Sequence, residues 1–203
     1  DGGRRVFLTY SSASQKVEDL RAHASGSPGE LFAAAEDLRS FDPATLIDTV
    51  EAHAGRVNSL VHAAALVDHT SFTSLSPERF ADVLAVNVVA AYALVRELVQ
   101  RGSLLDVVLL SSIASSIADL GSAAYTTSKG AADALTRALA VELSPWVRVN
   151  AVAPGIVRSY RTANDPLFSG PLARVPDAAL VDAADVAALV EHLLDGQPRS
   201  LHG

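Results

Sequence analysis

The stretch Leu104–Lys129, "LLDVVLLSSIASSIADLGSAAYTTSK", decides what this chain can be. It begins as an apolar run typical of a buried strand and continues through small polar residues into a helix. Ser112 stands at the end of the predicted strand. Tyr125 and Lys129 are four residues apart, so their side chains share one helix face. An ammonium group stabilises a neighbouring phenolate, as an acid–base tyrosine requires. These three residues are therefore candidates for proton-transfer chemistry.

The rest of the chain alternates strand-like and helical segments. Asp42 is the predicted N-cap of one helix, with Pro43 at its first position and Gly55 as its stop. Strands are predicted at 6–10, 31–35, 57–65, 104–112 and 147–154, the third buried on both faces; helices are predicted at 14–23, 42–55, 76–102, 123–143 and 183–194, the last capped by Asp182. In the helix at 76–102, Leu84, Val88, Ala91 and Val95 have helical spacing.

This alternation predicts an α/β fold. Strands separated by helix-length segments pair in parallel through right-handed crossovers, which places helices on both faces of the sheet. We therefore expect residues 1–203 to form one Rossmann-like domain with a single doubly wound parallel sheet. In such a sheet ligands bind beyond the C-terminal ends of the strands.

Composition excludes several classes of function. A net charge of -7, with scattered lysines and arginines, argues against a nucleic-acid binder or a membrane-surface patch. The chain has no cysteine, and its six histidines are far apart, so we expect no metal site. No apolar run reaches the ~20 residues that cross a bilayer, and no signal peptide is recognised, which predicts a cytoplasmic protein.

Several motifs resemble the short-chain dehydrogenase/reductase family, most closely between Val57 and Gly155. The sequence "YTTSK" fits the family's YxxxK, and Ser112 fits its catalytic serine. "LAVNVVAAY" fits the motif whose asparagine, here Asn87, completes a tetrad. "VNAVAPGIVRS" resembles the segment that turns toward the nicotinamide, and "EDLRSFDPATL" resembles the segment that holds the adenine ring.

The resemblance implies a role for each residue of the tetrad. Tyr125 would be the general acid in reduction, Ser112 would polarise the carbonyl, and Lys129 would also hold the nicotinamide ribose. Asn87 would support a water relay to Lys129. The cofactor would be NADP or NAD. The implied cofactor-binding residues are Thr9, Ser11, Ser12, Asp37, Leu38, Ala63, Lys129, Pro154, Gly155, Val157 and Ser159.

The first turn departs from the family pattern. Laid over the family's TGxxxGxG, the chain keeps Thr9 but places Tyr10, Ser14 and Lys16 where the glycines stand. Those glycines permit a tight turn, close approach of the pyrophosphate and close helix–strand packing. The family's NNAG reads "HAAA" at 62–65. Serine hydroxyls and backbone N–H groups still offer a phosphate site at a helix N-terminus, so the sequence leaves cofactor binding open.

The chain is also short in two places. Twenty-seven residues separate Thr9 from Asp37, which is room for one helix and one strand where the family has a further strand. Either a segment near 25–30 is omitted, or the strand at 31–35 pairs directly with the first strand, which would leave Glu36 or Asp37 as a ribose-binding acid. The C-terminal "GQPRSLHG" predicts no seventh strand.

Three functions stay open. The first is a ketoreductase that transfers hydride between NAD(P)(H) and a small-molecule carbonyl or secondary alcohol. The second is a dehydratase, isomerase or cyclase that uses Tyr125 and Lys129 for proton transfer alone. The third is a non-catalytic homologue. The resemblance implies a homodimer or homotetramer paired through the helices at 76–102 and 123–143. A polar segment with Tyr160, Leu167 and Phe168 is a candidate substrate lid.

Overall fold

The computed structural model describes residues 4–12, 14–25, 29–158, 180–195 and 200–203. The predicted lid residues and Ser159 lie outside these ranges. In chain order the elements are β1 (Arg5–Tyr10), α1 (Ser14–Ala24), β2 (Glu30–Ala35), α2 (Pro43–Ala54), β3 (Ser59–His62), α3 (Pro77–Leu84), the π-helix η1 (Ala85–Val89), α4 (Ala90–Arg101), β4 (Asp106–Leu110), the 3-10 helix η2 (Ile113–Ser115), α5 (Ala123–Leu143), β5 (Arg148–Val152), β6 (Val157–Arg158), β7 (Val181–Asp182) and α7 (Ala183–Leu194).

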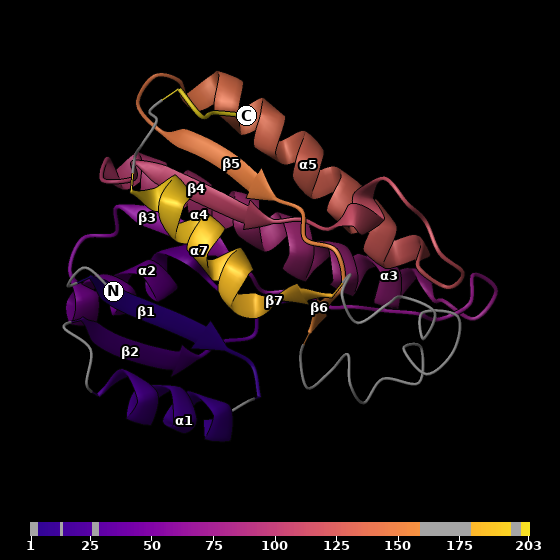
Figure 1. The fold of residues 1–203 in the computed structure, drawn as a ribbon, viewed down its shortest axis with the longest axis horizontal. Helices are drawn as coiled ribbons and strands as arrows, with labels where there is room; N and C mark the ends of the chain where they lie inside the picture. Colours follow the sequence, from indigo (N-terminus) through magenta and orange to yellow (C-terminus); the bar gives the residue numbers. More distant parts are fainter. Residues whose placement is uncertain (1–3, 13, 26–28, 159–179, 196–199) are drawn as a thin grey trace.

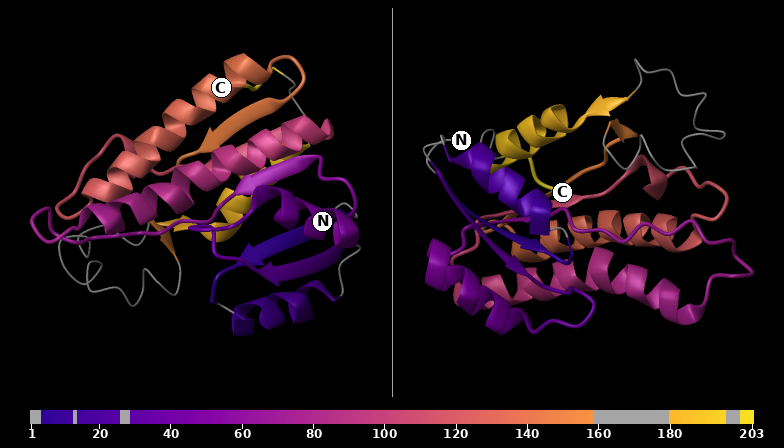
Figure 2. Two further views of the ribbon diagram at one scale, coloured as in Figure 1. Left: turned by 180° about the vertical axis from the view of Figure 1, so that it is seen from behind. Right: turned by 90° about the horizontal axis from the view of Figure 1, so that it is seen from below.

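The described strands pair in parallel, which confirms the Rossmann-like class. The largest sheet has the order β3-β4-β5, and Asp106 aligns with both Ser59 and Arg148. Figure 1 shows α7 across one face of this sheet, and Figure 2 shows α4 and α5 on the opposite face. Helices thus cover both faces, as parallel strands require.

The first βαβ unit pairs directly. β1 and β2 are neighbours over their whole length, from Arg5 opposite Glu30 to Tyr10 opposite Ala35. The direct-pairing interpretation of the short N-terminal segment is therefore confirmed. The described strands form three hydrogen-bonded groups, β1-β2, β3-β4-β5 and β6-β7, whereas the sequence predicts one continuous sheet. Strand adjacency depends on the packing of the whole domain, which local sequence patterns do not encode.

Several helix ends follow from local chemistry. The Asp42 side chain accepts a hydrogen bond from Thr45 N at 2.7 Å, and Pro43 opens α2 as predicted. Gly55 ends this helix with a φ of 75°, which glycine adopts without steric cost. Asp182 occupies the predicted N-cap position of α7, but its side chain makes no capping hydrogen bond and instead pairs with Arg158 at 3.4 Å.

The predicted helix at 76–102 contains a π-turn. Ala90 N bonds to Ala85 O, five residues back, so η1 adds one residue to a helical turn. The insertion rotates the buried face of α4 relative to that of α3. Of the predicted stripe, Ala91 and Val95 are buried on α4, whereas Leu84 and Val88 before the junction are partly exposed.

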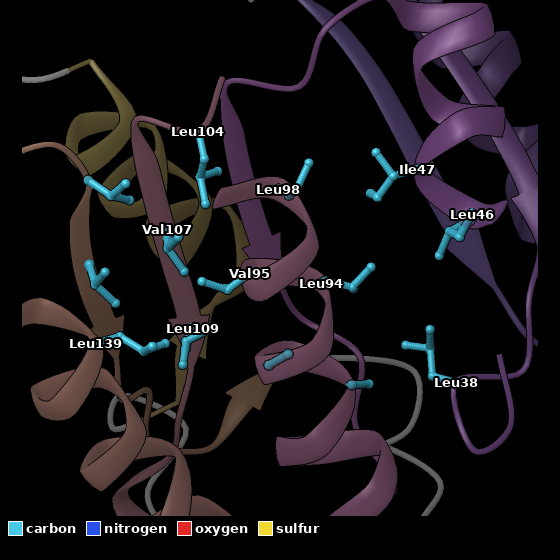
Figure 3. Packing of buried hydrophobic residues seen from close by; sticks show 14 of the residues in the cluster. Leu38, Leu46, Ile47, Leu94, Val95, Leu98, Leu104, Val107, Leu109 and Leu139 are labelled. Carbon is cyan, nitrogen blue, oxygen red and sulfur yellow. The ribbon is translucent and has the colours of Figure 1, made fainter. Parts of the chain in front are cut away.

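The main hydrophobic core lies between α4 and the sheets. Val95 of α4 lies toward Val107 and Leu109 of β4, and Leu94 lies on the opposite side of the helix, toward α2 (Figure 3). Leu98 is fully buried, and burying such a side chain contributes about 1.5–3 kcal/mol. The prediction that the third strand is buried on both faces is wrong, because β3 is an edge strand of its sheet and Val61 is 38% exposed.

The end of the chain lies beside β5. Gly203 N donates to Val149 O at 2.9 Å, and Asn150 Nδ2 donates to Leu201 O at 3.2 Å. In the described ranges, no helix has the length and apolar character needed to cross a membrane.

Candidate active site

The serine of the candidate site follows the central strand of the largest sheet. After β4, Ser111 N donates to Val152 O at 2.8 Å and Ile113 N donates to Pro154 O at 3.1 Å, so this turn is fixed to the end of β5. Ser112 is half-buried, and its Oγ accepts a hydrogen bond from Ala114 N at 3.1 Å. Because the hydroxyl acts as an acceptor here, its own proton is available to a ligand oxygen.

Lys129 lies directly beneath this turn. Its side chain is 4% exposed, and its Nζ donates to Leu110 O at 2.5 Å. The Nζ also lies 5.6 Å from the ring centroid of Tyr125, a cation–π distance that confirms the shared helix face. Burial lowers the pKa of Lys129 from 10.5 to about 8, against a smaller opposing effect of Asp133. The ammonium group can therefore exchange a proton near neutral pH.

Asn87 joins three parts of the fold. Its Oδ1 accepts from Leu66 N at 2.7 Å, and its Nδ2 donates to Leu66 O and to Ser128 Oγ, both at 2.9 Å. Ser128 Oγ in turn donates to Tyr125 O at 2.7 Å. The amide side chain thus ties the π-turn to the loop after β3 and to α5, the helix that carries Tyr125 and Lys129. A water relay from Asn87 to Lys129 stays a prediction.

The cofactor residues predicted in the first βαβ unit lie on the other sheet. Thr9 is in β1, and the exposed Ser11 and Ser12 precede α1. Asp37 follows β2, and its ion pair with Arg39 lowers the pKa of this exposed carboxyl to about 2. Leu38 is 9% exposed and packs in the main core, so its side chain faces α2 and α4 (Figure 3).

The remaining predicted residues lie nearer the tetrad. Ala63 is exposed just beyond β3, and Pro154 contacts the Ser112 turn through its carbonyl. Gly155 lies next to Ile113, whose Cδ1 would be 4.0 Å from a Cβ at this position. Val157 pairs with Val181 between β6 and β7. The structure therefore brings the tetrad and the segment around Pro154 together and places Thr9, Ser11, Ser12 and Asp37 on the neighbouring sheet.

A hollow of about 580 Å³ adjoins this region between α7 and the sheets. Its lining includes Ala63 and Leu110, the residue whose carbonyl holds Lys129, together with Val61 and Val190. A hollow of about 710 Å³ lies between α1, β2 and α2, away from the tetrad. Among the described residues, no three His, Asp or Glu side chains gather as metal ligands.

The predicted site residues do not include Ser128 and His62, which are buried polar residues in this region. Ser128 is completely buried between Asn87 and Tyr125, and its position three residues after Tyr125 is a sequence signal that could have identified it. His62 is 6% exposed and donates from Nε2 to Val86 O at 2.9 Å. Its signal is the single polar residue in "HAAA".

Comparisons with known proteins identify the family of this chain. Residues 1–203 match the family model described as enoyl-(acyl carrier protein) reductase. The chain is a short-chain dehydrogenase/reductase. It is 34% identical over 174 residues to the granaticin polyketide synthase putative ketoacyl reductase 2 of Streptomyces violaceoruber, covering 82% of this chain and 68% of that protein. It is 30% identical over 205 residues to the 2-(R)-hydroxypropyl-CoM dehydrogenase of Xanthobacter autotrophicus, covering 94% and 81%.

The fold is similar to that of solved members of the family. A short-chain dehydrogenase from Burkholderia cenocepacia, solved in complex with NADP, superposes with a TM-score of 0.86 at 25% identity and covers 98% of this chain and 83% of that one. As a member of this family, the chain is an oxidoreductase.

Proposed function

We propose that this short-chain dehydrogenase/reductase is a ketoreductase that transfers hydride between NAD(P)(H) and a carbonyl or secondary alcohol. Its catalytic residues are Ser112, Tyr125 and Lys129, with Asn87 in support. One observation carries the proposal. A lysine that is 96% buried has its ammonium group 5.6 Å from the tyrosine ring and bonded to the last residue of β4, two residues before the serine. Removing an ammonium group from water to this extent is unfavourable, which favours a functional role for the lysine over a purely structural one.

Each residue has a separate task in the reduction. Ser112 donates a hydrogen bond from its hydroxyl group to the substrate oxygen and so polarises the carbonyl. Tyr125 transfers its phenolic proton to the same oxygen as negative charge develops there. Lys129 stabilises the phenolate that remains and, with its lowered pKa, supplies the replacement proton. In the oxidative direction the same groups move the proton the opposite way.

The residues present fit a nicotinamide dinucleotide. Lys129 uses one of its three N–H donors on Leu110 O, which leaves two for hydroxyls. Ser11 and Ser12 are exposed just before the N-terminus of α1. The N–H groups and the dipole at a helix N-terminus favour a bound anion even where the turn contains no glycine. Ala63 and Ala65 leave the end of β3 uncrowded. When bound, the dinucleotide supplies or accepts the hydride. Thr9, Asp37, Leu38, Gly155 and Val157 are proposed as further contacts, with Leu38 contributing its backbone.

The substrate is proposed to carry an apolar portion. Ile113, Ile117 and Leu120 follow Ser112, and their side chains are 45%, 66% and 91% exposed. An exposed apolar group at the rim of a catalytic turn suits a ketoacyl or similar aliphatic carbonyl compound. The names of the ketoacyl reductase relative and of the 3-oxoacyl-[acyl-carrier-protein] reductase of Bos taurus support this class.

We further propose that residues 1–203 act as one domain within a homodimer or homotetramer. Val89 at the end of η1, Tyr92 on α4 and Val141 on α5 are large apolar side chains exposed to solvent. They lie on the two helices that the family resemblance assigns to the subunit interface. Measuring the mass of the protein in solution tests the assembly.

The sequence of the turn after β1 favours a second candidate function. Tyr10, Ser11 and Ser12 replace the glycine-rich sequence, so an enzyme that uses Tyr125 and Lys129 for proton transfer alone is the alternative. Assays with NADPH and NADH against an acetoacetyl thioester and a secondary alcohol separate the two. The proposal predicts nicotinamide turnover that is lost in the Tyr125→Phe variant. Equal turnover by that variant would contradict the assigned mechanism.

A further inference from the structure

A histidine stands where the family's NNAG segment would begin. His62 ends β3 and is 6% exposed, while Ala63 and Ala65 after it are exposed. Its Nε2 lies 2.9 Å from Val86 O. Because a carbonyl oxygen only accepts, Nε2 carries the proton in this bond. Desolvation and the charge of Lys129 lower the pKa of His62, so the buried ring is neutral. The tautomer is therefore fixed by the fold.

The acceptor lies inside the π-turn. Val86 is the second residue of η1 and directly precedes Asn87. A π-turn departs from the regular helical hydrogen-bond ladder and is unfavourable unless outside contacts hold it. The His62 ring supplies such a contact from β3, a strand that is close in space but 24 residues away in sequence.

The contact is continuous with the catalytic helix. Asn87 reaches from the π-turn to Leu66 and to Ser128, and Ser128 bonds to Tyr125 O and precedes Lys129. We propose that His62 is a positioning residue that, by bonding Val86 O, holds the π-turn in the register that places Asn87 against the Tyr125–Lys129 face of α5. Its kinetic consequence rests on the proposed ketoreductase function.

Three substitutions isolate the Nε2 donor. His62→Gln keeps an N–H donor the same number of bonds from Cβ, His62→Asn shortens its reach by one bond, and His62→Leu removes it while keeping a large apolar side chain. Since a small displacement of catalytic groups costs up to ~100-fold, we expect kcat to fall about 10- to 100-fold in His62→Leu with KM changed less than about threefold. His62→Gln should stay within about threefold of the parent. Equal losses in His62→Gln and His62→Leu, or no loss in either, would overturn the proposal.

Amide hydrogen exchange gives a readout that does not need activity. Losing the donor to Val86 O should raise the exchange rates of the amides in η1 about tenfold in His62→Leu and leave them near the parent rates in His62→Gln. Should His62→Leu fail to fold, the comparison of His62→Gln with His62→Asn carries the test, with slower exchange expected in the glutamine variant. Unchanged exchange rates across all folded variants would refute the proposed role of His62. A parent without reductase activity would contradict the proposed function and leave the exchange result to judge His62.

Discussion

Replacing Lys129 by methionine should make the protein more stable while removing its activity. The lysine is 4% exposed, and burial lowers its pKa from 10.5 to about 8. Since a tenfold change in proton affinity is about 1.4 kcal/mol, keeping the ammonium charged in the fold at neutral pH costs about 3 kcal/mol. Methionine keeps most of the apolar stem and removes the charge.

The stabilisation expected from Lys129→Met is smaller than the free-energy cost of burying the charged lysine. The substitution also removes the hydrogen bond to Leu110 O and the contact with the Tyr125 ring, which together contribute about 1–2 kcal/mol. The expected net change is therefore a stabilisation of about 1–2 kcal/mol. For a chain of 203 residues this raises Tm by about 2–8 °C.

Urea unfolding at pH 7 and pH 10 provides the assay. A lysine whose native pKa is lowered destabilises the fold below that pKa, and the penalty disappears as pH rises from about 8 toward 10.5. The advantage of Lys129→Met should thus be largest at pH 7 and shrink at pH 10. Arg137→Met, on the exposed face of the same helix, is the matched control and should change stability by less than about 0.5 kcal/mol. A variant less stable than its parent at pH 7, or an advantage that does not change with pH, would refute the reasoning.

Three further predictions concern single residues. Tyr125→Phe should lower kcat at least ~100-fold in a nicotinamide absorbance assay with KM little changed, because the proton donor is lost and the half-buried ring is kept; a fall in kcat below tenfold would contradict the role. Asp68→Asn should cost about 1–2 kcal/mol in urea unfolding at pH 7, since Asp68 bonds Arg79 at 2.7 Å. That ion pair lowers the pKa of Asp68, so the difference should vanish as the pH falls below 3.8, and a difference that persists in acid would argue against it. Asp42→Ala should cost about 1 kcal/mol in the same measurement, because Thr45 N loses its cap; an unchanged midpoint would contradict this.

The elements that local chemistry specifies could be predicted from the sequence. The helix at Ala123–Leu143 was predicted with the observed bounds, and so was the shared face of Tyr125 and Lys129, because helical spacing alone fixes that geometry. The cap at Asp42 was likewise predictable from residue type and position.

Local sequence patterns do not predict the π-turn or the strand pairing, because both depend on contacts between residues far apart in the sequence. No residue within Ala85–Val89 signals a π-turn, whose contacts with distant parts of the fold are the His62 ring at Val86 O and the Leu66 carbonyl at the Asn87 side chain. Strand pairing was a similar case. Continuous apolar character predicts a doubly buried third strand, yet Val61 of β3 lines the hollow between α7 and the sheets and is 38% exposed.

Titration with NADPH and with NADH, followed by nicotinamide fluorescence, tests the central claim most directly. We propose that the serine-containing turn at Tyr10–Ser12 and the buried Lys129 together bind a nicotinamide dinucleotide without the family's glycines. We expect a saturable signal with at least one of the two coenzymes, and a weaker signal in the Lys129→Met variant even though that variant should be the more stable one. No saturable signal at millimolar coenzyme, with circular dichroism showing the folded protein, would contradict it.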